Sequence, residues 1–131
     1  MPKYSIITTC KGRLAHLQQT LPRFLEFPES EVIVVDIACP EKAGDWVESK
    51  YPSARVIRMP DEKVLNLPRA RNTGAENATG ETLLFFDADI IVSPALYEEV
   101  SRKLKKGAYG VFGTSQENIP NDLRGSFAVS C

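Results

Sequence analysis

The run Val32-Ile33-Val34-Val35, which ends at Asp36, constrains the fold of this chain more than any other feature. Four consecutive β-branched residues favour a strand, and a strand without polar alternation is typically buried on both of its faces. Such strands are found in parallel sheets, where crossover helices cover both sides of the sheet. The rest of the chain should therefore supply further strands that alternate with helices.

Strand and helix patterns do alternate along the chain. We predict strands over 4–9, 31–36, 54–59, 82–86, 110–114 and 126–129, and helices over 13–27, 45–50, 66–78 and from Ser93 to a stop at Gly107. Pro22 should bend or split the first helix. Ser93 should cap the last helix, with Pro94 at its first position. This pattern predicts an α/β fold, a doubly wound and mostly parallel sheet with helices on both faces.

Length and composition exclude several classes of protein. The 131 residues correspond to one domain, and 16 Lys and Arg residues against 17 Asp and Glu residues give no basic excess for binding nucleic acid. No apolar stretch approaches the ~20 residues of a membrane-spanning helix, and the N-terminus lacks a signal-peptide pattern. Three cysteines without a Cys-x-x-Cys motif, and a single histidine, leave no zinc framework. We expect a cytoplasmic protein with reduced thiols. Its basic run at 102–106 is a solvated helix end or, alternatively, a contact to the inner face of the membrane.

Acidic residues follow several of the predicted strands. Ligands of doubly wound sheets bind outside the carboxyl ends of the strands, so these acids should share one edge with Thr8 and Thr9. Asp87 and Asp89 give the sharpest signal, because residues i and i+2 of an extended segment point to the same side. Two such carboxylates repel each other unless a proton or a cation intervenes, and Mg²⁺ or Mn²⁺ would relieve that repulsion. Taken alone, such a pair is more often two acids at a solvated strand end, and only its context favours a metal site.

Several motifs, in this order, resemble the donor-binding half of a family 2 glycosyltransferase with the GT-A fold. Tyr-Ser-Ile-Ile-Thr-Thr-Cys at 4–10 is similar to the first strand of the family, and 32–36 is similar to the second. Ala-Arg-Asn-Thr-Gly-Ala at 70–75 resembles the Ala-Arg-Asn-x-Gly helix of the family. Leu-Phe-Phe-Asp-Ala-Asp at 84–89 resembles its metal-binding strand, and 125–129 extend the similarity.

The resemblance implies an enzyme that uses a nucleotide-diphospho-sugar with Mn²⁺ or Mg²⁺ and transfers the sugar with inversion. A UDP-sugar is the favoured donor, and the acceptor, a glycan or a lipid-linked molecule, is not identified. Asp89 would coordinate the metal, and Asp87 would share it or bind sugar or ribose hydroxyls. Arg71 would brace Asp36 or Asp87, or reach the diphosphate; an ordinary exposed arginine on the helix is an equally open alternative. The residues placed at the donor are Thr8, Thr9, Asp36, Arg71, Asn72 and Asp87.

The chain departs from the family at two points. Ile37 stands where the family often has a second acid, which leaves the base of the nucleotide open. The acceptor-binding half, with its catalytic base, normally follows the point where this chain stops. We therefore expect 1–131 to be a single nucleotide-sugar-binding domain, incomplete at its C-terminus and prone to self-association, with the base beyond Cys131. Glu117 is the candidate base within the chain.

Two other functions fit parts of the sequence. The first is a donor-binding fragment or module without turnover of its own, which would share the fold and the ligand. The second is a phosphatase of the haloacid-dehalogenase type, which also has an Asp-x-Asp motif after an apolar strand. In those phosphatases a Thr follows two residues after the second Asp, where this chain has Ile91. This second alternative is the less favoured one.

Overall fold

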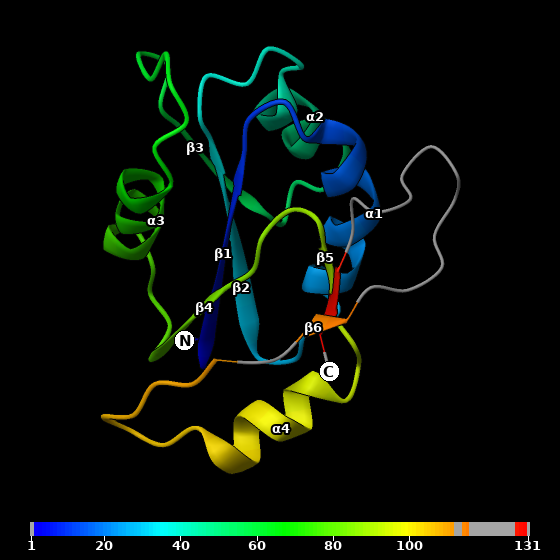
Figure 1. The fold of residues 1–131 in the computed structure, drawn as a ribbon, viewed down its shortest axis with the longest axis vertical. Helices are drawn as coiled ribbons and strands as arrows, with labels where there is room; N and C mark the ends of the chain where they lie inside the picture. The colour runs from blue at the N-terminus through cyan, green and yellow to red at the C-terminus, as the bar shows by residue number, and fades with distance from the viewer. Residues whose placement is uncertain (1, 112–113, 116–127, 131) are drawn as a thin grey trace.

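The structure is a computed structural model that describes residues 2–111, 114–115 and 128–130 (Figure 1). The elements are β1 (Tyr4–Cys10), α1 (Leu14–Leu25), β2 (Ser30–Asp36), α2 (Ala43–Lys50), β3 (Arg55–Arg58), α3 (Leu67–Glu76), β4 (Thr82–Phe85), β5 (Ile90–Ile91), α4 (Leu96–Lys103), β6 (Thr114–Ser115) and β7 (Ala128–Ser130). Four strands form a parallel sheet in the order β3-β2-β1-β4. The strands β5, β7 and β6 form a second, smaller sheet, in which β6 is antiparallel to β7.

Helices cover both faces of the four-stranded sheet, and α3 lies on the opposite side from α1 and α2 (Figure 1). The apolar run of β2 divides between these faces. Val32 and Val34 pack in the buried cluster that contains α1 and α2 side chains, whereas Ile33 and Val35 pack with Ala70 of α3. The prediction of a doubly wound α/β fold with a mostly parallel sheet is therefore confirmed.

Some local expectations about the helices are wrong. The helix α1 is continuous through Pro22 and is not split there. The helix α4 begins at Leu96, because Ser93 and Pro94 belong to a turn in which Leu96 N donates to Ser93 O at 3.0 Å. It ends at Lys103, before Gly107. In the part of the chain that the structure describes, no helix is long and apolar enough to cross a membrane.

The strands that follow β4 also differ from the prediction. The two-residue strand β5 was not expected, and residues 110–111 lie outside any strand. The strand β7 overlaps the strand predicted over 126–129, and it pairs with β5 on one side and with the short β6 on the other. The two-residue strands β5 and β6 carry too little sequence pattern to be recognised, because alternation needs a window of about four to eight residues.

The strand order reverses at β1. The strands β2 and β3 lie successively on one side of β1, and the chain then returns to place β4 on the other side. In doubly wound sheets, ligands bind outside the carboxyl ends of the strands that flank such a reversal, which are β1 and β4 here. Thr8, Thr9 and Asp87 all lie at that reversal point. The topology alone marks this edge as the place for a ligand.

Glu31, near the amino end of β2, ties the sheet to the loop that precedes β4. Its carboxylate accepts hydrogen bonds from Ser5 Oγ at 2.6 Å, from Thr79 N at 2.6 Å, from Thr79 Oγ1 at 2.9 Å and from Arg55 Nη1 at 3.0 Å. Burial by itself would raise the pKa of Glu31, but these hydrogen bonds outweigh it and lower the pKa to about 2. The ionised carboxylate is thus part of the folded structure.

We expect acid to weaken the fold through Glu31. Its folded pKa lies below the ordinary value of 4.5, so its ionised form stabilises the fold above about pH 4.5, and this contribution is lost as the pH falls toward 2. Glu31→Gln should lower the free energy of unfolding at pH 7 by about 1–2 kcal/mol, allowing for solvent screening, and should flatten its dependence on pH below 4.5. Urea denaturation at pH 7 and pH 3 measures both effects. Glu26→Gln, at an exposed position, is the control, and an equal loss in both variants would contradict the expectation.

Candidate functional site

The acids of the Asp87-Ala88-Asp89 motif lie on a turn, not on an extended strand. β4 pairs with β1 only as far as Phe85, and Phe86 N makes one further hydrogen bond, to Ile7 O. Ile90 N then donates to Asp87 O at 3.1 Å, which closes a turn over 87–90. The expected strand alternation of the two carboxylates is therefore wrong, because no neighbouring strand among the described residues keeps this segment extended.

Arg71 of α3 reaches the same turn. Its Nη2 atom lies 2.8 Å from Asp87 Oδ1, and the two side chains are 38% and 51% exposed. Of the two carboxylates expected as partners of Arg71, Asp36 and Asp87, the structure therefore pairs it with Asp87. Gly74 makes this approach feasible, because a Cβ atom there would lie 2.5 Å from Ile7 Cγ2 of β1. An ion pair this exposed adds little stability, so its main consequence is the orientation of Asp87.

Asp89 is the less constrained acid of the turn. It is partly exposed, and within the described residues no hydrogen bond or ion pair engages its carboxylate. Both acids offer the hard oxygen ligands that Mg²⁺ and Mn²⁺ prefer. No group of three or more His, Cys, Asp or Glu residues that could hold a metal occurs in the described part of the chain. Asp87 and Asp89 therefore suit an ion such as Mg²⁺, which is bound by one or two carboxylates of a protein and by oxygen atoms of water and phosphate.

Asp36 is buried and both of its oxygens are used inside the protein. Oδ1 accepts from Cys39 N at 2.7 Å, and Oδ2 accepts from Gly44 N at 2.9 Å, in the first turn of α2. A carboxylate at a helix N-terminus satisfies free backbone N–H groups and the helix dipole. The structure therefore shows Asp36 holding the loop between β2 and α2. Its contact with a nucleotide stays a prediction.

The remaining predicted residues are placed as follows. Thr8 is buried on β1, and its Oγ1 has no hydrogen-bond partner among the described residues, while Thr9 is half-buried. Asn72 is exposed on α3. Glu117 lies outside the described residues. The structure thus brings Arg71 and Asp87 into contact, with Asp89 on the same turn, and leaves Asn72 at the surface.

Lys11 is a residue of this edge that the sequence reasoning missed. Its Nζ donates to Ile37 O at 3.0 Å, to Ala38 O at 3.4 Å and to Glu62 O at 3.3 Å. One ammonium group therefore joins the loops that follow β1, β2 and β3, and its three donors all have partners. A lysine directly after a strand, at the edge where ligands bind, was the available signal.

Cys10 is an unreactive neighbour of the same edge. Both Cys10 and Cys39 are free and buried. Burial, followed by the nearby Cys39 thiol, raises the pKa of Cys10 to about 12. Since only the thiolate is a good nucleophile, Cys10 is not a candidate for covalent chemistry at neutral pH.

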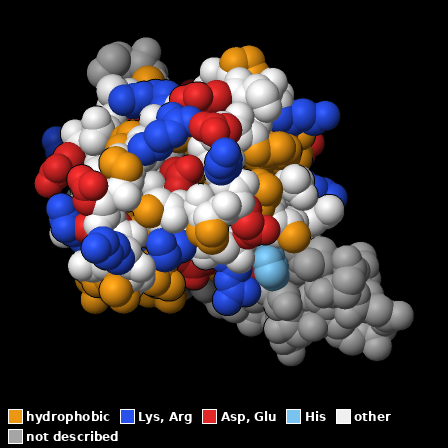
Figure 2. All heavy atoms as spheres, turned by 90° about the horizontal axis from the view of Figure 1, so that it is seen from above, with side chains coloured by type: hydrophobic (Ala, Val, Ile, Leu, Met, Phe, Trp, Pro, Cys, Tyr) orange, Lys and Arg blue, Asp and Glu red, His pale blue; other side chains and the backbone are white. Residues whose placement is uncertain are grey.

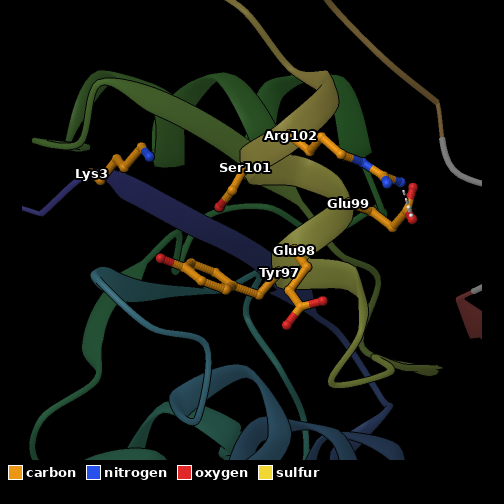
Figure 3. A pocket seen from close by; sticks show the side chains of 6 residues that line it. All are labelled: Lys3, Tyr97, Glu98, Glu99, Ser101 and Arg102. Carbon is orange, nitrogen blue, oxygen red and sulfur yellow. Dashed lines mark hydrogen bonds and ion pairs between the residues drawn. The ribbon is translucent and has the colours of Figure 1, made fainter.

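Figure 2 looks onto the carboxyl edge of the sheet and shows acidic and basic side chains intermixed there, without a large field of one sign. A hollow of about 490 Å³ lies at the opposite edge, beside α4 and the start of β1 (Figure 3). Its lining residues are Lys3, Tyr97, Glu98, Glu99, Ser101 and Arg102. None of the predicted site residues lines it. Tyr4 OH contacts Ser101 Oγ at 3.1 Å there, so this hollow belongs to the packing of α4 on the sheet.

Several known proteins resemble this chain in sequence. The family model described as glycosyl transferase family 2 matches residues 5–127. The chain is 28% identical over 127 residues to the uncharacterized glycosyltransferase EpsJ of Bacillus subtilis, which covers 95% of this chain and 35% of EpsJ. It is 27% identical over 116 residues to the O-antigen biosynthesis protein RfbC of Myxococcus xanthus, which covers 86% of this chain and 9% of RfbC. The chain therefore spans about a third or less of these relatives.

Solved structures show the same fold. TarS 1–349 of S. aureus has a TM-score of 0.67 at 22% identity, over 88% of this chain and 41% of that chain. The mannosyltransferase PcManGT of Pyrobaculum calidifontis, in complex with GDP-Man and Mn²⁺, has a TM-score of 0.63 at 23% identity, over 92% of this chain and 37% of that chain. The parallel sheet covered by helices is the GT-A arrangement of these neighbours.

Proposed function

Because this chain belongs to glycosyltransferase family 2, we propose that it binds a nucleotide-diphospho-sugar together with Mn²⁺ or Mg²⁺ as part of a glycosyltransferase. The observation that carries the proposal is the position of Asp87 and Asp89 on one turn, at the point where the strand order of the sheet reverses. A structure of TarS 1–349 in complex with UDP, 26% identical to this chain with a TM-score of 0.55, and the PcManGT complex with GDP-Man and Mn²⁺ support it.

In this proposal each residue of the edge has a defined task. Asp89 holds the metal, and Asp87 shares it or accepts hydrogen bonds from sugar or ribose hydroxyls. Arg71 orients Asp87 and offers its remaining donors to the diphosphate, a geometry that suits the planar guanidinium group. When bound, the ion neutralises the charge of the departing diphosphate. The residues proposed to line the nucleotide and sugar are Thr8, Thr9 and Asn72. Asp36 is proposed to contribute by holding the loop between β2 and α2 beside the nucleotide.

Several finer points are part of the same proposal. The donor is a UDP-sugar, with GDP-sugars as the alternative that Ile37 leaves open. Transfer inverts the anomeric carbon, and the base is Glu117 or lies in sequence beyond Cys131. Leu83 and Phe85 of β4 are 38% and 46% exposed, which supports self-association or covering by further sequence. We place the protein in the cytoplasm or at the inner face of the membrane. A donor-binding module without turnover is the second candidate.

We expect residues 1–131 to release nucleoside diphosphate slowly from the correct donor, only when Mn²⁺ or Mg²⁺ is present, and to transfer sugar inefficiently. Departure of the diphosphate needs the metal and water, whereas transfer also needs a base, which is worth about 10²–10⁴-fold. Chromatography of a panel of UDP- and GDP-sugars, incubated with Mn²⁺ or with EDTA, measures the release. As a control, Asp45→Asn changes an exposed acid of α2 and should release diphosphate at the same rate as the wild type.

Each other outcome of this experiment has a defined meaning. Donor binding without release favours the binding module. Release that is the same in EDTA contradicts the role of the metal. Efficient transfer would show that the base lies within the chain, and Glu117→Gln would then test its position. Failure of every donor to bind in the presence of metal would contradict the proposed function itself.

A further inference from the structure

The helix α1 contacts the acidic turn at two consecutive points. Thr20 Oγ1 donates a buried hydrogen bond to Ala88 O at 2.8 Å, across 68 residues of sequence. One helical turn further along, the Phe24 ring packs on Phe86, with 5.3 Å between the ring centroids. Thr20 and Phe24 are both fully buried. The residues on either side of Asp87 are therefore held by the same helix.

The spacing of these contacts is a geometric match. Residues four apart on a helix lie on the same face, about 6 Å apart along its axis. Thr20 and Phe24 therefore meet Ala88 and Phe86 with the same face of α1. Phe24 supplies apolar packing, while Thr20 supplies the one directional contact.

The hydrogen bond from Thr20 acts on the central peptide of the turn. In a turn over 87–90, the Ala88 carbonyl belongs to the peptide unit that joins Ala88 to Asp89. Type I and type II turns share the bond from residue i+3 to residue i, here Ile90 N to Asp87 O, and differ by a rotation of this central peptide. Asp89 does not have the positive φ that a type II turn needs at that position. The Thr20 hydroxyl bonds to this peptide in the orientation that the structure shows, and no other described group bonds to Ala88 O.

We propose that Thr20 is a positioning residue for metal and donor binding: its hydroxyl holds the Ala88–Asp89 peptide so that the Asp89 carboxylate faces the donor side of the turn. Thr20 itself touches neither the ion nor the donor. For its ligand this inference rests on the proposed function, whereas the hold on the turn is a property of the chain alone.

The test replaces the hydroxyl without changing the shape of the side chain. Thr20→Val should weaken binding of Mn²⁺ alone about tenfold or more, as the loss of other groups that orient metal ligands does. Thr20→Ser should restore most of the affinity. Ser30→Ala is the control, because it removes a similar hydrogen bond at the other end of the sheet, from Ser30 Oγ to Phe27 O at 2.6 Å. This variant should bind Mn²⁺ with the affinity of the wild type. Free Mn²⁺ measured by electron paramagnetic resonance gives the three affinities, and melting curves without metal show that each variant folds.

Hydrogen exchange gives a second readout that needs no metal. In Thr20→Val the Ile90 amide, which closes the turn, should exchange faster with solvent than in the wild type, and in Ser30→Ala it should not. Unchanged exchange in Thr20→Val would overturn the proposal. Unchanged Mn²⁺ affinity in that variant, or an equal loss in Ser30→Ala, would also overturn it. If the wild type binds no Mn²⁺ even with UDP present, the proposed function fails, and the exchange result still decides whether Thr20 holds the turn.

Discussion

Asp89→Asn should abolish the gain in nucleotide affinity that Mn²⁺ provides, with little effect on the fold. Asparagine keeps the size of the side chain but loses the charge that attracts the ion. We expect the affinity for UDP in the presence of Mn²⁺ to fall at least about tenfold, because losing a ligand costs no less than losing a group that orients one. The free energy of unfolding should change by no more than about 0.5 kcal/mol, since Asp89 is partly exposed and no described group is bound to it. Calorimetric titration of UDP, with Mn²⁺ and with EDTA, measures the gain directly.

Two further variants make this test specific. Asp87→Asn frees Arg71 from its ion pair and should reduce the metal gain less than Asp89→Asn does. Asp45→Asn, whose side chain is 66% exposed on α2, should leave the gain unchanged. A full metal gain in Asp89→Asn would remove Asp89 from the assigned role.

Asp36→Asn should destabilise the fold by about 2–4 kcal/mol. An amide has one acceptor oxygen, so the N–H group of Cys39 or of Gly44 would face an NH₂ group and stay unpaired, and a buried group of this kind costs about 1–3 kcal/mol. The α2 N-terminus would also lose the negative charge that it now faces. Urea denaturation at pH 7 gives the free energy of unfolding. The same substitution at Asp45, exposed in the first turn of α2, is the matched control. Wild-type stability in Asp36→Asn would contradict the anchoring role.

The sheet could be predicted because its signals are local and strong. The apolar run of β2 fills both faces of the sheet, and the strand–helix alternation leaves little choice of architecture. The edge where we propose the site followed from the same argument, since parallel strands bring their carboxyl ends together. Arg71 was singled out, but its choice between Asp36 and Asp87 depends on how closely α3 packs at Gly74, which no local pattern specifies.

The features that sequence reasoning missed all depend on where tertiary pairing stops or which groups meet through space. The turn at 87–90 begins because β4 pairs with β1 only to Phe85. Asp36 finds its partners in a loop whose path is not encoded in a short motif. Thr20 did leave a signal, a polar residue on the apolar stripe of α1 between Leu17 and Phe24, but its partner lies far along the chain.

Paramagnetic broadening would locate the metal-dependent nucleotide site that we propose outside the carboxyl ends of β1 and β4. Sub-stoichiometric Mn²⁺ with UDP should selectively broaden the amide signals of Thr9, Arg71 and 87–89 in a ¹H–¹⁵N spectrum. Signals from 97–102, beside the hollow at the opposite edge of the sheet, should keep their intensity. Broadening centred on 97–102, or spread evenly over the molecule, would contradict the claim.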